Sequence, residues 1–513
     1  MVAWLAGVGL LVKREYFKTS ALKFEEAAAR VGPGASYYTV TMGGGPIGYV
    51  SSTIDTLPDT ILVQSNTVLD IQALGTVQQT GITTVIKLSR TLHLRSFEAE
   101  LVSGSTRYRA TGVVEGDTAL NVAIEAGGAP QRQRIHLRRP LVLPELVNLR
   151  LAVGGALKTG QTFTMRTFDP MLMEEHEVAM QVLAESTMVF PDSAGFDRAA
   201  QRYVAARFDT VQAFKVSQTF GGVTTEQWID AQGNIVRANS PLGFTIERTA
   251  FEIAVQNWLH DREKGATSAA GAGSDVIGAT AIAANVRLQP EELRVLRVRI
   301  GNVGLGGFDL SGGRQRLAGD TLVVTREPGL GRQPTGEPPP LYGARLPLTS
   351  HGDTAVARAL RSEPLVQSDD PRIQAQARRI AGGERRANRV AELLTTWVYD
   401  NLEKKITISV PSALQVLDAR SGDCNEHTVL YVALARALGL PARTAAGVVY
   451  LRGRFYYHAW PEVWLGEWVA VDPTFGQFPA DASHLRFVVG GLARQVELVR
   501  LIGRLRLTVV PAA

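Results

Sequence analysis

The stretch that decides the fold of this chain is SGDCNEHTVLYVALARALGLP, residues 421–441. Ser421 and Asp423 are residue types that cap the N-terminus of a helix, and Gly439 marks its end. Apolar residues recur between these signals at spacings of three and four, which predicts a helix with one buried face: Leu430, Ala433, Leu434, Ala437 and Leu438. A buried helix of this kind holds Cys424 rigidly in its first turn.

Cys424 is the single cysteine of the chain, so no internal disulfide forms. One cysteine is compatible with the cytosol and with the bacterial periplasm. A thiol is mostly protonated at neutral pH, but the free N–H groups and the dipole of a helix N-terminus favour the thiolate. A lone cysteine is more often a small buried hydrophobe than a nucleophile, so its role depends on its neighbours.

Two strands rich in aromatic and β-branched residues follow, at 455–464 and 467–471, with a turn at Gly466. A hairpin loop of about three residues there would place His458 opposite Asp472. Cross-strand partners have Cβ atoms about 4.5–5.5 Å apart, near enough for a carboxylate to fix the imidazole tautomer. A two-residue loop would shift the register by one. Thiol, imidazole and carboxylate together are the groups that nucleophilic acyl transfer needs.

Three motifs carry a resemblance to a known family: Gly-Asp-Cys before a helix, an aromatic-His-Ala-Trp strand, and Val-Asp-Pro-Thr. Over roughly residues 365–490 the chain resembles the bacterial transglutaminase-like superfamily, which is related to papain-type thiol enzymes. The resemblance implies that Cys424 is the nucleophile, His458 the general base, and Asp472 the residue that orients His458. The helix expected at 388–402 matches the one that usually precedes the nucleophile. The segments PSAL (411–414), NEHT (425–428) and DPTFGQ (472–477) are similar to one bacterial branch of this group.

The sequence also departs from the animal cross-linking transglutaminases, which have Gln before the Cys and Trp after it. Here these positions are Asp423 and Asn425, and no segment resembles the calcium loops. The resemblance therefore favours a thiol-dependent amide hydrolase or acyltransferase, similar to a cysteine protease, that acts on protein or peptide amides through a thioester. Two alternatives stay open: a protein-glutamine transglutaminase, and a non-catalytic peptide-binding or scaffolding module of the bacterial envelope. The chemistry requires no metal ion and no organic cofactor.

Several further residues near these motifs have open roles. His427 lies one turn after Cys424 and could tune the site, bind a metal, or pack in the helix. Gln477 and His484 follow Asp472 and could line a cleft or hold a loop. The backbone N–H of Cys424 is the one oxyanion donor that the sequence assigns. Two upstream side chains are further candidates: Trp397 and Gln415.

Composition narrows the function classes. The chain has 513 residues, 45% of them apolar, which is enough for more than one domain with large cores. The net charge of +5 is small for this length, and no Lys/Arg stripe with interleaved aromatic residues is present. We therefore expect no nucleic-acid binding.

The pattern along the chain predicts an α+β protein in which a large antiparallel β-rich domain precedes the transglutaminase-like (papain-like) core. Short β-type runs separated by turn signals dominate from about residue 35 to 251, with helices expected at 196–206 and 16–31. The predicted division is a β-rich domain, a flexible linker, a small β-containing segment, a Pro/Gly linker and the catalytic domain: 15–263, 264–275, 276–328, 329–349 and 350–513. The tail at 496–510 is expected to add a closing strand.

The first residues, 1–14, form an apolar segment followed by basic residues. A membrane-spanning helix needs about 20 apolar residues, and a signal peptide has basic residues before its apolar run. The segment therefore fits a buried or interfacial helix, a degenerate anchor, or the end of an anchor that starts upstream. The family resemblance favours membrane association in the bacterial cell envelope, anchored or periplasmic. The basic residues after the apolar run argue against this orientation, so the cytoplasm stays open.

Overall fold

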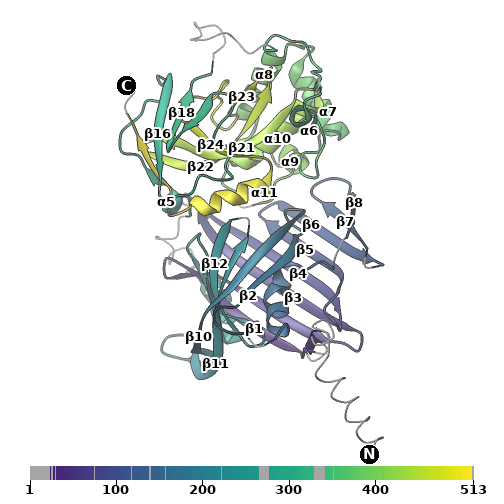
Figure 1. Cartoon of the computed structure of the whole chain (residues 1–513), viewed down its shortest axis with the longest axis vertical. Coiled ribbons are helices and arrows are strands. Elements are labelled where there is room, and N and C mark those ends of the chain that lie inside the picture. The colour runs from purple at the N-terminus through teal and green to yellow at the C-terminus, as the bar shows by residue number, and fades with distance from the viewer. Residues whose placement is uncertain are drawn as a thin grey trace, which may run out of the picture.

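The computed structural model describes residues 31–510, apart from 74–75, 117, 138–139, 156, 221, 265–275, 328–340, 351 and 408, together with Phe24, Ala27 and Ala28. The predicted apolar segment 1–14, the flexible linker 264–275 and the Pro/Gly linker 329–349 lie wholly or largely outside these residues, as does most of the helix expected at 16–31. The fold is α+β, as predicted, and Figure 1 shows its two parts, with β1–β14 in one and the later elements in the other.

The first part is one antiparallel sheet of 14 strands. Their order across the sheet is β8-β7-β6-β5-β4-β3-β2-β1-β14-β13-β12-β11-β10-β9, so the first strand pairs with the last. The strands are β1 Gly34–Met42, β2 Gly45–Thr56, β3 Thr60–Ala73, β4 Thr76–Ser89, β5 Leu94–Ser103, β6 Thr106–Glu115, β7 Ala119–Glu125, β8 Gln131–His136, β9 Thr162–Asp169, β10 Glu174–Asp197, β11 Arg202–Phe220, β12 Val223–Asp230, β13 Ile235–Asn239 and β14 Phe244–Thr249.

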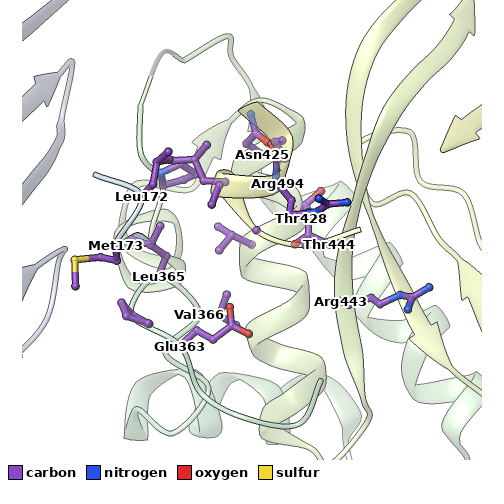
Figure 2. Close-up of a pocket in the computed structure, with 18 of the residues that line it drawn as sticks. Leu172, Met173, Glu363, Leu365, Val366, Asn425, Thr428, Arg443, Thr444 and Arg494 are labelled. Atoms are coloured by element: carbon purple, nitrogen blue, oxygen red, sulfur yellow. The ribbon is translucent and has the colours of Figure 1, made fainter. Parts of the chain in front are cut away.

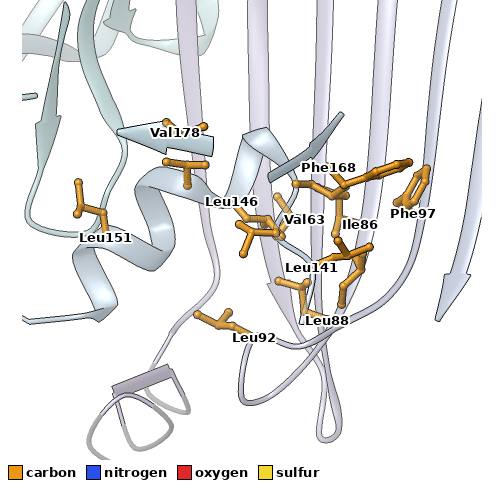
Figure 3. Packing of buried hydrophobic residues seen from close by; sticks show 14 of the residues in the cluster. Val63, Ile86, Leu88, Leu92, Phe97, Leu141, Leu146, Leu151, Phe168 and Val178 are labelled. Carbon is orange, nitrogen blue, oxygen red and sulfur yellow. The ribbon is translucent and has the colours of Figure 1, made fainter. Parts of the chain in front are cut away.

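Alternation of side chains explains why these strands share one core. In β5 and β6 every second residue is buried, which places one face of the sheet on the core and leaves the other toward solvent. A connecting segment packs against the buried face and contains two short helices, η1 Pro144–Leu146 and α3 Val147–Val153. Figure 3 shows Leu146 and Leu151 of this segment among side chains from the strands: Val63, Ile86, Leu88, Phe97, Phe168 and Val178.

The helix predicted at 196–206 is wrong, because this segment is the end of the long hairpin β10–β11. Phe196 pairs with Tyr203 across the hairpin, and their rings lie 5.2 Å apart. The Asp197 carboxylate accepts hydrogen bonds from the N–H groups of Ala199 and Ala200, which closes the turn. The strand pairing and this turn therefore override the helix propensity of the alanines.

After η2 Glu252–Gln256 and α4 Asn257–Glu263 the chain enters the second part. Two of its elements lie beside β22: α5 Val276–Thr280, which contacts it, and β15 Ile282–Ala283, which pairs with it. A four-stranded sheet in the order β17-β18-β16-β25 follows, formed by β16 Val295–Gly301, β17 Gln315–Ala318, β18 Thr321–Thr325 and β25 Arg506–Val509. The expected closing strand in the tail is confirmed by β25, which pairs with β16. It spans only Arg506–Val509, because the first residues of the tail form the short helix η3 Val496–Leu501. The domain boundaries themselves stay a prediction.

The second part places α10 Cys424–Ala437 between helices and a sheet. On one side lie α7 Pro371–Ala381, α8 Ala387–Asn401 and α9 Ala413–Ala419, and on the other β21 Ala442–Leu451 and β22 Arg454–Trp464. The remaining elements are α6 Thr354–Arg358, β19 Glu403–Lys404, β20 Ser421–Gly422, β23 Trp468–Ala470, β24 His484–Val489, α11 Leu492–Gln495 and η3 Val496–Leu501. The helices predicted after Cys424 and over 388–402 are thus confirmed as α10 and α8.

The two parts contact each other directly. Ala126, after β7, accepts hydrogen bonds on its carbonyl oxygen from Ser412 Oγ at 2.5 Å and Gln367 Nε2 at 3.2 Å. Val410 of the second part belongs to the same apolar cluster as the large sheet. Among the described residues, no helix combines the length and the apolar character needed to cross a bilayer.

Candidate active site

The start of α10 is fixed by a reciprocal cap. Asp423 is the N-cap residue, and its carboxylate accepts a hydrogen bond from the N–H of Asn425 at 2.9 Å. Glu426 Oε2 accepts in return from the N–H of Asp423 at 3.0 Å, and its Oε1 accepts from Ser409 Oγ at 2.6 Å. This capping box makes Cys424 the first residue of the helix, where its own N–H has no acceptor within the helix. Glu426 therefore builds the cap in addition to matching the helix dipole.

Gly422, just before this cap, lies so close to Glu426 that there is no room for a side chain. Its φ is 157°, and a Cβ at this position would lie 2.2 Å from Cβ of Glu426. We expect Gly422→Ala to lower the free energy of unfolding by about 2 kcal/mol or more, because the methyl group would displace the capping Glu426. Urea denaturation measures this change. Gly304→Ala is the matched control, since its Cβ would meet nothing within 4 Å, and an equal effect of the two substitutions would contradict the expectation.

The hairpin β22–β23 carries His458 and leads to Asp472. Its loop has three residues, as expected, but Trp464 pairs with Trp468 and Glu462 with Ala470. In this register Asp472 falls beyond the last pair and lies nearer Trp460 than His458, so the predicted pairing of His458 with Asp472 is wrong by two positions. A shift of two keeps both side chains on one face of the hairpin, and a diagonal neighbour remains within side-chain reach.

The structure brings His458 and Asp472 into direct contact. The distance from His458 Nε2 to Asp472 Oδ2 is 2.7 Å, and both side chains are buried. A carboxylate is an acceptor, so Nε2 donates, and Nδ1 is the one ring nitrogen left for a reacting group. The imidazole is held between Phe475, with ring centroids 4.9 Å apart and an interplanar angle of 13°, and Trp460 at 6.1 Å. The ring therefore has a fixed tautomer and a fixed plane.

Cys424 lies beside the residue that follows His458. The N–H of Ala459 hydrogen-bonds the thiol, and the side chain is partly buried against β-strand residues. Burial raises the pKa of Cys424 well above its ordinary value, and the Asp423 carboxylate adds to this rise, whereas the Ala459 N–H opposes it. We expected the helix N-terminus to lower this pKa, but desolvation outweighs it in the resting structure. The thiol is therefore protonated until a base takes its proton.

Two residues that sequence reasoning left open join the site. His484 Nε2 lies 2.9 Å from Asp472 Oδ2, the same oxygen that His458 bonds. Its Nδ1 lies 3.2 Å from Oδ1 of Asp481, a residue that the sequence did not single out. Gln477 supports this pair, because its Nε2 donates to Asp481 Oδ2 at 2.8 Å. The one sequence signal for this contact was His484 itself, a second histidine close after the Asp-Pro-Thr motif and three residues after Asp481.

His458, Asp472 and His484 also offer three ligand atoms within 4.8 Å of one another, a set that could hold a metal ion. Hydrogen bonding accounts for all of these contacts, since each Nε2 lies at hydrogen-bond distance from an oxygen that only accepts. A metal ion would require both Nε2 atoms to be deprotonated and would compete with this arrangement. We therefore assign the cluster to hydrogen bonding, and no step below uses a metal.

The other predicted residues lie elsewhere or serve the helix. His427 is fully buried, and its Nδ1 donates to the carbonyl of Asp423 at 2.7 Å, which supports helix packing as its role. Gln415 donates its amide to the carbonyl of Arg107 in the large sheet. The ring of Trp397 lies under the Arg420 guanidinium at 4.6 Å. These contacts bring neither Gln415 nor Trp397 to the thiol.

A pocket of about 370 Å³ lies where the large sheet meets the second part. Figure 2 shows Leu172 and Met173 from the first part facing Leu365 and Val366 of the second, with Asn425 and Thr428 of α10 close by. Asn425 directly follows Cys424 in α10. The contact between the two parts therefore forms a partly apolar space near the start of α10.

Comparisons with known proteins add a family to this geometry. Two solved structures are similar to parts of this chain: a candidate cysteine protease from Cytophaga hutchinsonii and a β-barrel-like protein of unknown function from Brucella abortus. The first is 17% identical, covers 42% of this chain and 83% of its own, and has a TM-score of 0.29. The second is 12% identical, covers 43% of this chain and 96% of its own, and also has a TM-score of 0.29.

No curated protein matches the chain. A family model, described as the transglutaminase-like superfamily, matches residues 374–473, which include Cys424, His458 and Asp472. The β22–β23 hairpin and the capping box at the start of α10 lie within these residues. Residues 374–473 of this chain are a transglutaminase-like superfamily domain.

Proposed function

We propose that this chain is a thiol-dependent amide hydrolase or acyltransferase that acts on protein or peptide amides, with Cys424 as nucleophile, His458 as general base and acid, and Asp472 as the group that orients His458. One observation carries the proposal: Asp472 occupies His458 Nε2 at 2.7 Å and leaves Nδ1 free, while the Cys424 thiol lies at the N–H of the adjacent Ala459. A thiol, a base and a residue orienting that base are thus gathered at one helix terminus.

The reaction follows from these positions. His458 Nδ1 takes the proton of the Cys424 thiol, and the sulfur attacks the carbonyl carbon of the amide to form a C–S bond. The resulting imidazolium gives this proton to the amide nitrogen, the C–N bond breaks, and an amine leaves. The acyl group is now a thioester on Cys424. Water or a second amine then attacks the thioester while His458 removes its proton, and the C–S bond breaks as the thiol is restored.

Charge on the carbonyl oxygen needs a donor during attack. The N–H of Cys424 is the first of α10 and has no acceptor within the helix. It lies on the same residue as the nucleophile and at the positive end of the helix dipole, which favours a developing oxyanion.

Two expectations from the sequence remain part of the proposal. We propose that the substrate is a protein or peptide and that the chain works in the bacterial cell envelope. Proteolysis of intact cells from outside, read with an antibody to the chain, tests the location independently of activity.

The activation of Cys424 by His458 is tested by its rate of alkylation with iodoacetamide as a function of pH. Because burial holds the resting thiol protonated, we expect the reaction near neutral pH to depend on His458 and to fall by about 10- to 100-fold in His458→Ala. His136→Ala, on the exposed edge strand β8, is the control for loss of a histidine. Equal, slow alkylation in wild type and His458→Ala would mean a structural cysteine and would overturn the proposed function.

A further inference from the structure

The polar network behind Asp472 continues past the three proposed catalytic residues. Asp472 Oδ1 accepts from the N–H groups of Thr474 at 2.8 Å and Phe475 at 3.1 Å. Its Oδ2 lies between His458 Nε2 at 2.7 Å and His484 Nε2 at 2.9 Å. Both oxygens are thus occupied, and Oδ2 is shared by two imidazoles, one of which belongs to the proposed catalytic residues.

His484 is built into the sheet that carries His458. It opens β24, and β21 lies between β24 and β22. Gly447 of β21 pairs with His458 on one side and follows a bulge toward β24 on the other. A Cβ on Gly447 would lie 2.0 Å from the carbonyl oxygen of Leu485, so glycine permits this close approach of the strands. The two imidazole rings consequently lie 5.9 Å apart with Asp472 between them.

Both nitrogens of His484 face a carboxylate oxygen. Nε2 bonds Asp472, and Nδ1 bonds Asp481, which is itself held by Ser483 Oγ at 2.6 Å and Gln477 Nε2 at 2.8 Å. Ionised carboxylates only accept, so both ring nitrogens donate and the ring is an imidazolium. Burial alone would lower the pKa of His484, but its hydrogen bonds with Asp472 and Asp481 raise it. Further charged groups line a small cavity that His484 also borders: Arg314, Glu327, Glu462 and Arg486.

We propose that His484, braced by Asp481, is a positioning residue that fixes Asp472 Oδ2 against His458 Nε2. The cation compensates the buried charge of Asp472 before any proton reaches His458, so Asp472 stays ionised and correctly turned while His458 is neutral. Without this second donor, Oδ2 would keep one partner and a buried carboxylate would lose its nearest permanent counter-charge. The inference rests on the proposed function for its consequence in catalysis, and on geometry alone for the placement of Asp472.

Two neutral substitutions distinguish the contact that His484 makes through Nε2 from the contact that it makes through Nδ1. His484→Gln places an amide nitrogen near Nε2 and keeps the donor to Asp472, whereas His484→Asn places one near Nδ1 and keeps the donor to Asp481. Both remove the positive charge and have similar size. Thermal unfolding of each variant reports whether the fold persists.

Histidine ¹⁵N NMR on the full chain, with EDTA present, reports which ring nitrogens of His458 and His484 carry a proton. This measurement does not require activity. In wild type we expect His484 to be protonated on both nitrogens and neutral His458 to carry its proton on Nε2. In His484→Asn the Nε2–H form of His458 should lose its dominance, while His484→Gln should retain it. An unchanged His458 tautomer in folded His484→Asn would overturn the proposal even if Cys424 proved unreactive.

The alkylation assay gives the second readout. We expect His484→Asn to slow alkylation of Cys424 by about 10- to 100-fold near neutral pH and to move its pH profile toward that of His458→Ala, with a smaller loss in His484→Gln, which keeps the donor to Asp472 but not the charge. A role in packing alone would lower the unfolding temperature in both variants and leave the pH profile unmoved. Failure of the proposed function is recognised separately, because it removes the difference between wild type and His458→Ala.

Discussion

Cys424→Ala is expected to reduce amide turnover by about 10⁴-fold or more, because the thiol supplies the covalent bond of the proposed thioester. The fold should persist, since Cys424 is a small, partly buried side chain at the start of a capped helix. A loss of about 1 kcal/mol or less would shift the unfolding temperature by only about 2–4 °C.

The measurement follows two products of an unstructured protein substrate: new N-termini, which report hydrolysis, and incorporation of a labelled primary amine, which reports transamidation. Loss of both in Cys424→Ala, with normal thermal unfolding, supports the proposed nucleophile. Cys424→Ser is the conservative comparison, because an alcohol is a far weaker nucleophile than a thiolate. A Cys424→Ala protein that kept at least a tenth of wild-type turnover would rule out covalent catalysis by this residue and favour a peptide-binding role.

Asp472→Asn is expected to lower turnover by about 10³- to 10⁴-fold, the size of effect seen when an orienting carboxylate is replaced in a catalytic triad. The backbone N–H groups of Thr474 and Phe475 need an acceptor at the position of Oδ1, so the side-chain oxygen of the new Asn must occupy it. The side-chain NH₂ group then occupies the position of Oδ2 and faces both histidines. His458 Nε2 must then accept, which moves its proton to Nδ1 and leaves no base toward the thiol. Steady-state turnover and His458 tautomer spectra check the two halves of this expectation.

The same substitution should change stability in a pH-dependent way. Although burial would raise the pKa of Asp472, the charges and hydrogen bonds of His458 and His484 hold it well below its ordinary value. The carboxylate therefore contributes stability that is fully present above its unfolded pKa of about 4 and is lost as the pH falls through the lower folded value. We expect Asp472→Asn to cost about 3 kcal/mol at neutral pH, with a smaller difference below about pH 4.

Urea denaturation at neutral and acid pH measures this difference. Asp418→Asn is the matched control, because Asp418 is exposed and pairs with Arg372 on the surface. Such a pair contributes about 1 kcal/mol or less. A cost for Asp472→Asn that stayed constant into acid would show that folding does not shift the pKa of this carboxylate, contrary to its two histidine partners.

Local signals in the sequence predicted the elements of the site well. The cap at Asp423 and the apolar spacing after it predicted α10, and the aromatic strands predicted the β22–β23 hairpin. The register was wrong by two positions because pairing continues to Trp464 and Trp468, whose rings pack at 5.2 Å. The loop has three residues as expected but falls one residue later in the chain, and side-chain packing near it, which no loop-length rule contains, thus decides its position.

The contacts of His484 with Asp472 and Asp481 could not be predicted in the same way. They depend on a bulge in β21 and on the return of the chain to pair β24 beside it, both of which are tertiary events. The large antiparallel sheet was predicted from alternation and turns, and it is confirmed. Its strand order was not predictable, because the pairing of β1 with β14 joins residues about 200 positions apart.

That pairing has a consequence for how the large sheet is assembled. On either side of it, every described neighbour in the sheet is also the neighbour in sequence: β1 to β8 run outward in one direction and β14 back to β9 in the other. Each half can grow by successive hairpins whose loop-closure entropy is small, whereas joining β1 to β14 closes a loop of nearly the whole sheet. We therefore expect the β1–β14 seam in the middle of the sheet, rather than either edge, to form last during assembly.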